Sequence, residues 1–176
     1  MVFPEVRPQP PRFHSPRERG TEAQGQLSTT SISLSRHRNE RRRSGKKRVF
    51  VAMPFSEEFQ DTFIFGIDAP VRARGFIPEK VDETSFTGDI LQRIKDGIES
   101  AEFLIADLTG ARPNVYLEVG YAWGHRVPVI FLARHGEKLH FDVSTHRCIY
   151  YKSIRHLASE LDRLIDDLME RPEAFE

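Results

Sequence analysis

From residue 47 onward, short apolar runs alternate with segments whose apolar residues recur at helical spacing, and this alternation leaves few possible folds. The β-branched and apolar runs predict five strands, at residues 47–53, 76–81, 102–106, 127–132 and 148–151. Helical spacing predicts helices at residues 59–71, 89–100, 114–123 and 153–170. Strands that alternate with helices form right-handed crossovers in a parallel sheet covered on both faces. We therefore predict an α/β fold with a flavodoxin-like, doubly wound parallel five-stranded sheet in the order 2-1-3-4-5.

Capping residues and helix breakers predict where the helices begin and end. Asp89 and Asn114 suit the N-cap positions of their helices, and Gly124 suits the position just after the second one. Pro70 is expected to kink or end the helix whose apolar face is formed by Phe59, Phe63, Ile67 and Val71. The next helix is expected to turn one face inward, formed by Ile90, Leu91, Ile94 and Ile98. Residues 134–146 are expected to form a long loop.

Charge divides the chain into two parts. Residues 1–48 hold twelve Lys and Arg against four Asp and Glu, a net charge of +8, and the rest of the chain carries −8. Because the leader is also poor in large apolar residues, we predict a disordered basic tail over residues 1–46, followed by the domain at 47–176. The tail is either a solvated segment or a weak binding site for an acidic partner. The acidic domain argues against nucleic acid as the main substrate, since phosphate binding relies on Lys and Arg.

Cysteine and histidine usage predicts a cytoplasmic protein without a metal or cofactor. Cys148 is the single cysteine, so it cannot form an internal disulfide, and it lies in an apolar run that suits the core. No apolar run approaches the roughly 18 residues of a membrane span, and the N-terminus lacks the apolar core of a secretory signal. The histidines lack the Cys or carboxylate framework of a zinc site, and there is no Gly-rich phosphate loop.

Ligands of doubly wound sheets bind beyond the carboxyl ends of the strands, where this chain has several polar residues. With Asn114 as the N-cap, Glu118 is expected in about the first turn of its helix, where the macrodipole favours an ionised carboxylate by about 0.3–1 kcal/mol. Such a carboxylate can attack an anomeric carbon or stabilise an oxocarbenium-like centre. Gly120 leaves the neighbouring surface open to a sugar ring. The alternative is that Glu118 only accepts hydrogen bonds from helix-end amides.

Three segments carry a resemblance to a known family: VFVAMPF at 49–55, GDILQRIKDGIESAEFLIADLTGARPNVYLEVGYAWGHRVPVI at 88–130, and the Phe141–Asp142 pair. Together they resemble the nucleoside 2-deoxyribosyltransferase-like family and the neighbouring TIR-like nucleotide-processing proteins, over nearly all of residues 48–151. The resemblance implies that Glu118 is the nucleophile and that Asp89 contacts the sugar or assists proton transfer. It also implies a homo-oligomer, because family members often complete the site with a neighbouring subunit.

The other candidate site residues each have a plainer alternative. Asp89 could be an ordinary N-cap, and Asp107 could bind ribose hydroxyls or hold the DLTG turn through its backbone. Phe55 or Tyr121 could stack on a base near Met53, although core packing is the commoner fate of aromatic residues.

The family's transferases carry an acidic residue just before the helix of the nucleophile, where this chain has Arg112, Pro113 and Asn114. Asn114 can donate to a hydroxyl or a base but cannot supply a proton at neutral pH. Arg112 suits a phosphate by charge and bidentate geometry, so a 5′-nucleotide or dinucleotide fits better than a bare nucleoside. The alternative for Arg112 is a solvated loop charge.

These observations predict an enzyme that cleaves an N-glycosidic bond in a nucleotide or nucleoside through Glu118, by hydrolysis or by transfer. One alternative is a TIR-like NAD hydrolase, which needs the same glutamate and a larger site. The other is a non-catalytic nucleotide sensor or interaction module, in which Glu118 is turned away from the crevice or locked in an ion pair.

Overall fold

The computed structural model describes residues 47–81 and 89–171, which form five parallel strands with helices on both sides. The predicted disordered tail at 1–46 lies outside these residues, as does most of the loop before Asp89. The strand order is β2-β1-β3-β4-β5, which confirms the predicted flavodoxin-like sheet. Its strands are β1 (Arg48–Ala52), β2 (Ile77–Glu79), β3 (Phe103–Asp107), β4 (Val129–Arg134) and β5 (Cys148–Tyr151).

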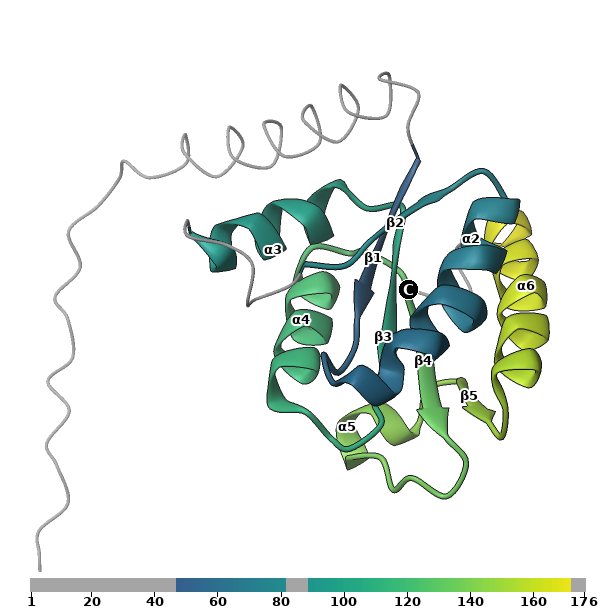
Figure 1. Cartoon of the computed structure of the whole chain (residues 1–176). Helices are drawn as coiled ribbons and strands as arrows, with labels where there is room; N and C mark the ends of the chain where they lie inside the picture. Colours follow the sequence, from purple (N-terminus) through teal and green to yellow (C-terminus); the bar gives the residue numbers. More distant parts are fainter. Residues whose placement is uncertain (1–46, 82–88, 172–176) are drawn as a thin grey trace, which may run out of the picture. The chain divides into compact units, whose positions relative to one another are not determined.

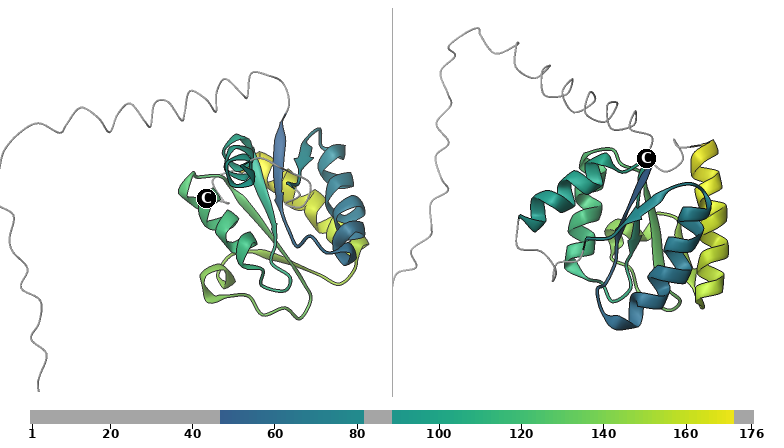
Figure 2. Two further views of the ribbon diagram at one scale, coloured as in Figure 1. Left: turned by 60° about the vertical axis from the view of Figure 1, so that its left-hand side comes forward. Right: turned by 45° about the horizontal axis from the view of Figure 1, so that its top comes forward.

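Helices cover both faces of the sheet (Figures 1 and 2). An apolar core lies on each face. On one face lie η1 (Glu57–Phe59), η2 (Thr62–Asp68), α2 (Ala69–Ala73) and α6 (Ile154–Glu170). On the other lie α3 (Ile90–Ser100), α4 (Pro113–Gly124) and the short α5 (Phe141–Ser144). All five residues of β3 are buried, as expected for a central parallel strand. None of the helices in the described ranges is long and apolar enough to span a membrane.

Pro70 does not end its helix, because the chain forms a π-helix immediately before it. The seven residues of η2 lead into α2, which contains Pro70 in its first turn. The amide of Ala69 donates to the carbonyl oxygen of Ile64, five residues back. The wider π turn makes room for a proline ring, which in an α-helix clashes with the carbonyl of the fourth residue before it. The helix therefore continues to Ala73.

Both predicted ends of α4 are wrong. Its N-cap is Arg112 rather than Asn114, because Pro113 has a φ fixed for the first helical position and forces the residue before it to be extended. At the other end Gly124 lies inside the helix, and Arg126 adopts the left-handed conformation, with φ of 55°. The Val127 amide donates to the Ala122 carbonyl oxygen at 2.9 Å, closing a turn that brings the chain back to the sheet before β4.

Three smaller predictions also need correction. Leu91 is 52% exposed instead of facing the core, because Ile94 and Ile98 suffice to seat α3 on the sheet. The second strand is shorter than the predicted 76–81, covering three residues with Pro78 in the middle. The predicted loop at 134–146 contains the single turn of α5, whose Val143 is buried in the core beneath α4.

Candidate functional site

Glu118 lies in a groove between α3 and α4. It is the sixth residue of α4, in the second turn rather than the first, because the helix begins at Pro113. Its side chain is 7% exposed. The groove has a volume of about 310 Å³, the lower end of the range for small-molecule sites. Its lining consists mostly of apolar side chains from both helices: Leu91, Ile94, Lys95, Ile98, Asn114, Leu117, Glu118 and Tyr121.

The apolar walls set the chemistry that Glu118 can perform. Little water reaches a carboxylate between aliphatic side chains, so its interaction with a developing positive charge is stronger there than in solvent. The helix macrodipole stabilises the ionised Glu118 carboxylate less than the sequence predicted, because the effect of the macrodipole decreases after the first turn. Asn114, one turn earlier, lines the same groove and can donate its amide to a ligand oxygen.

Tyr121 also lines the groove, but its hydroxyl is held away from ligands by α3. The hydroxyl donates to Glu99 Oε1 at 2.5 Å, and the ring stacks on His125 with centroids 4.4 Å apart. Burial, followed by the hydrogen bond to Glu99, raises the pKa of Tyr121 to about 12, so the phenol is protonated at neutral pH. Tyr121 therefore fastens α4 to α3 and offers the groove part of its ring.

Within the part of the chain that the structure describes, Asp89 and Glu118 line different hollows. Asp89 is exposed at the N-cap of α3, and its Oδ1 accepts a hydrogen bond from the Gln92 amide at 3.0 Å. It lines a separate hollow of about 420 Å³ together with Arg48, Glu79 and one side of α3. The capping role is thus present in this structure, and the segment just before Asp89 lies outside the described residues.

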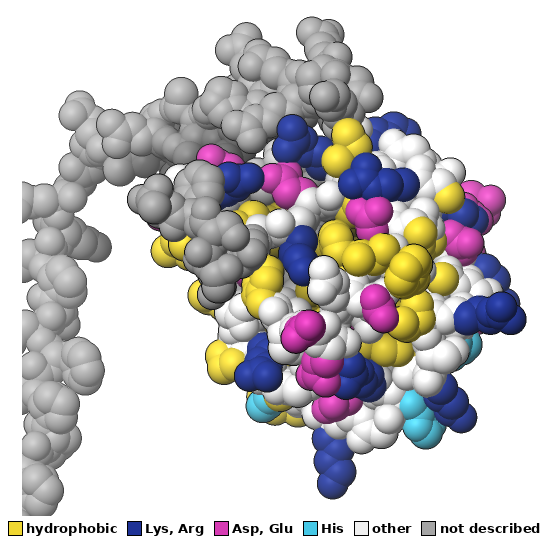
Figure 3. Space-filling view, viewed as in Figure 1, with side chains coloured by type: hydrophobic (Ala, Val, Ile, Leu, Met, Phe, Trp, Pro, Cys, Tyr) yellow, Lys and Arg dark blue, Asp and Glu magenta, His cyan; other side chains and the backbone are white. Residues whose placement is uncertain are grey.

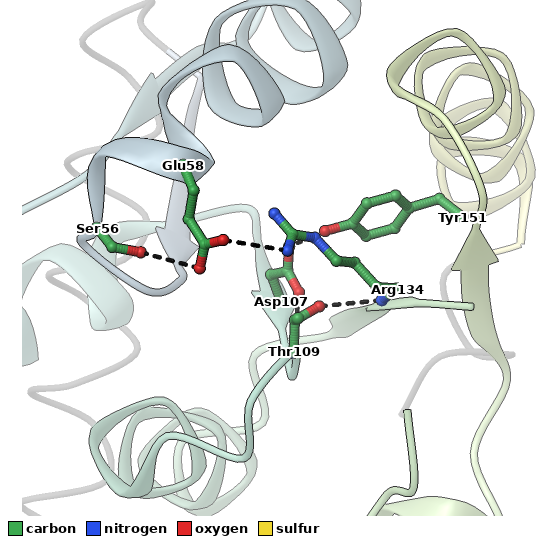
Figure 4. A network of polar contacts seen from close by, with 6 residues as sticks. All are labelled: Ser56, Glu58, Asp107, Thr109, Arg134 and Tyr151. Carbon is green, nitrogen blue, oxygen red and sulfur yellow. Dashed lines mark hydrogen bonds and ion pairs between the residues drawn. The ribbon is translucent and has the colours of Figure 1, made fainter. Parts of the chain in front are cut away.

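Asp107 is fully buried at the end of β3, with both carboxylate oxygens hydrogen-bonded. Oδ1 accepts from the Thr109 amide at 3.0 Å, and Oδ2 accepts from the Tyr151 hydroxyl at 2.9 Å (Figure 4). Burial raises the pKa of Asp107, while these hydrogen bonds act in the opposite direction. The bond to the Thr109 amide holds the turn at Asp-Leu-Thr-Gly, which is one of the two roles predicted for Asp107.

Arg134 extends this network toward the loop after β1 (Figure 4). Its backbone amide donates to Thr109 Oγ1 at 2.9 Å. Its guanidinium donates to Glu58 Oε2 at 3.4 Å and lies over the Phe59 ring at 4.4 Å. Thr109, Tyr151 and Arg134 are not among the predicted site residues, although a polar residue at the end of an apolar strand is a signal for this edge of the sheet.

The remaining predicted binding residues are scattered around the same edge. Met53 is 1% exposed and belongs to the core between the sheet and α6, so its side chain packs inside the protein. Phe55 is 37% exposed, with the Lys80 ammonium 5.4 Å from its ring centroid. Arg112 is exposed at the start of α4. Within the described ranges, no group of three or more His, Cys, Asp or Glu residues has the arrangement of a metal site.

Charges of both signs are interspersed on the face shown in Figure 3. Lys, Arg, Asp and Glu side chains surround a gathering of apolar ones, so this face has no extended patch of one sign. Nucleic acid binds to extended basic patches, and the face in Figure 3 does not have one.

The solved structures that share this fold include two enzymes. The CMP N-glycosidase of Clostridium botulinum aligns with a TM-score of 0.53 and 22% identity, covering 67% of this chain and 99% of its own. A 2-deoxyribosyltransferase of Bacillus psychrosaccharolyticus aligns with a TM-score of 0.51 and 14% identity, covering 65% of this chain and 90% of its own. No protein-family model and no curated protein matches the sequence. The chain thus has the nucleoside 2-deoxyribosyltransferase-like fold that its sequence resembles.

Proposed function

We propose that this protein cleaves the N-glycosidic bond of a nucleotide or nucleoside, with Glu118 as the nucleophile. The observation that carries the proposal is the position of Glu118, a buried carboxylate in a groove lined mostly by apolar side chains. Proteins of the same fold include a CMP N-glycosidase and a 2-deoxyribosyltransferase, whose reactions both break a bond between a sugar and a base. We further propose that the protein works in the cytoplasm.

In the proposed reaction, a Glu118 oxygen forms a bond to the anomeric carbon while the bond to the base nitrogen breaks. The electron pair stays on the base, which takes up a proton as it leaves. Water then releases the sugar from Glu118, or a second base accepts it, as in other reactions through a glycosyl-enzyme. The apolar walls of the groove favour this chemistry because they exclude competing water. We assign proton donation to Asp89, which requires its carboxyl group to leave the Gln92 amide.

A 5′-nucleotide is the preferred substrate in this proposal. Arg112 is exposed at the N-terminal end of the helix that carries Glu118, six positions before it. A phosphate there would meet the guanidinium and the positive end of the helix macrodipole. Asn114, between the two, would donate to a sugar hydroxyl or to the base. The nucleotide would therefore lie along the first two turns of α4.

The test is product analysis after incubating the protein with a panel of substrates: 2′-deoxynucleosides with and without a second base, 5′-ribonucleotides including CMP, 5′-deoxynucleotides, and NAD. The proposal predicts release of free base from at least one 5′-nucleotide. A new nucleoside in the presence of a second base would identify transfer, and nicotinamide release from NAD alone would favour the TIR-like alternative. Binding of panel members without any base release would contradict the proposal and favour the nucleotide sensor.

A further inference from the structure

The hydrogen-bonded network at the carboxyl ends of β3, β4 and β5 connects the segment after β1 with the loop after β3 (Figure 4). Asp107, Arg134 and Tyr151 each end a strand, and the strands are neighbours in the sheet. In the β4–β5 register Arg134 is paired with Tyr151, which brings both residues to the same level. The network is therefore a property of the sheet edge and not of a single loop.

One arm of the network fixes the loop after β3. The Tyr151 hydroxyl donates to Asp107, whose other oxygen accepts from the Thr109 amide, so the first turn of this loop is held from β5. The loop runs only to Arg112 before α4 begins. The same arm thus helps to hold in place the start of the helix that carries Glu118, whose first residue is set by Pro113.

The second arm fixes the loop after β1, and Arg134 serves both arms. Its backbone amide donates to Thr109 Oγ1, while its guanidinium contacts Glu58 and the Phe59 ring. Glu58 and Phe59 follow Phe55 by three and four residues, in the loop and short helix after β1. A single residue therefore links the two loops: its backbone amide contacts the loop that leads to Glu118, and its side chain contacts the segment that follows Phe55.

We propose that Arg134 and Tyr151 are positioning residues that hold these two loops in the relative arrangement required by the substrate. The proposal rests on the function proposed above. Neither residue lines the groove of Glu118. Instead, both line a separate hollow of about 550 Å³ with Glu58 and Thr62, so they act on the reaction through the loops.

The Tyr151→Phe variant tests the first arm. It removes only the hydroxyl that donates to Asp107 and leaves the buried ring in place. Because a displacement of about 1 Å can cost on the order of 100-fold in rate, we expect kcat for base release to fall about 10- to 100-fold, with a change in KM of less than about threefold. The matched control is Tyr150→Phe, the same chemical change on the next residue of β5, where the side chain is 42% exposed. We expect this control to keep wild-type kinetics.

The Arg134→Met variant tests the second arm. It keeps an unbranched side chain over Phe59 but loses the charge and the hydrogen bond to Glu58. The loop after β1 contributes binding residues and not the nucleophile. We therefore expect KM to rise about 10-fold, a larger change than the decrease in kcat. Arg134→Lys keeps the charge, so it should recover part of the loss. If Arg134 had only a structural role, its substitution would lower the melting temperature without changing KM more than kcat.

Hydrogen exchange provides a readout that does not depend on activity. Amides of residues 108–112 should exchange faster in Tyr151→Phe, those of residues 55–59 should do so in Arg134→Met, and Tyr150→Phe should match the wild type. If the wild type releases base from no panel substrate, the proposed function fails, and these exchange rates alone decide whether the network holds the loops. If the wild type is active while both variants keep its exchange rates, kcat and KM, the positioning role is overturned and the proposed function stands.

Discussion

Two buried carboxylates, Asp107 and Glu118, lie near the same edge of the sheet in very different surroundings. Burying a carboxylate is costly unless hydrogen bonds replace its water. Asp107 has such bonds on both oxygens, from Thr109 and Tyr151, and it is sealed from solvent. Glu118 lines a groove large enough for part of a ligand. Access from the groove therefore favours Glu118 for the chemistry, and the bond to the Thr109 amide favours Asp107 for holding the loop.

The Asp107→Asn substitution should test this division. An asparagine can accept from the Thr109 amide and donate to the Tyr151 hydroxyl, so the variant should fold with a free energy of unfolding within about 1 kcal/mol of the wild type. Base release should be largely retained. Loss of turnover with an unchanged melting temperature would instead make Asp107 a participant in proton transfer.

The same variant should change how stability depends on pH. The pKa of Asp107 is raised in the folded protein, mainly by burial, so its stabilising contribution is complete below about pH 4 and is lost as pH rises through the raised value. Asparagine does not titrate. Relative to the wild type, Asp107→Asn should thus become more stable as pH increases from 4 to 7, in urea unfolding at several pH values. A constant difference between the two proteins would contradict the pKa direction.

Arg112→Ala should separate nucleotides from nucleosides. If the guanidinium binds the 5′-phosphate, its loss should cost about 1.5–3 kcal/mol in kcat/KM for the nucleotide, the usual value of a hydrogen bond to a charged group. The matching nucleoside serves as the control, because it lacks the phosphate. Equal losses for the two substrates would remove Arg112 from the phosphate site.

At the scale of elements, periodicity predicted which helices and strands form, and local geometry decided where they end. The last helix agrees with the sequence because its apolar spacing is regular, and the Ser153 hydroxyl caps it by accepting from the His156 amide at 3.2 Å. The start of α4 was mispredicted because the fixed φ of Pro113 outweighs the capping preference of Asn114. The network of Arg134 and Tyr151 could not be predicted, because it joins residues whose proximity exists only after the strands pair.

Two glycines of α4 allow helix stability and ligand access to be separated. A methyl group added at Gly120 or at Gly124 would meet no atom within 4 Å. Alanine at either position should stabilise the protein by up to about 1 kcal/mol through helix propensity. If the sugar approaches α4 beside Glu118, Gly120→Ala should raise KM despite this gain, while Gly124→Ala should not. The melting temperature and the kinetics of both variants test whether the ligand approaches α4 beside Gly120. Identical kinetics in the two variants would mean that it does not.

At the scale of the molecule, the two apolar cores explain why the sheet order could be predicted although no side-chain contact was known. The core beneath α6 and the core beneath α3 and α4 require helices on opposite faces of one parallel sheet. Because the crossovers are right-handed, only a few strand orders satisfy this requirement. The site could be predicted only in part, because Asp89 and Glu118 share an edge in the sequence pattern but line different hollows.

We predict that the protein is a homodimer or a higher oligomer, as the resemblance implies. Leu91 and Leu117 are 52% and 66% exposed beside the groove, and apolar side chains gathered in this way are often covered by a partner. Light scattering at micromolar concentration should give at least twice the monomer mass. Leu117→Glu should reduce that mass, whereas Phe65→Glu, an exposed apolar residue on η2, should not. A monomeric wild type would contradict the prediction.

The most direct test of the catalytic role of Glu118 is base release by Glu118→Gln, measured beside its melting temperature and ligand affinity. Glutamine keeps the size of the side chain and much of its hydrogen bonding but loses the charge. Turnover should fall by orders of magnitude, while affinity stays within a few-fold, because the lost interaction belongs to the transition state. The melting temperature should change little. Wild-type turnover in Glu118→Gln would contradict the assignment, and a large fall in melting temperature would instead indicate a structural role.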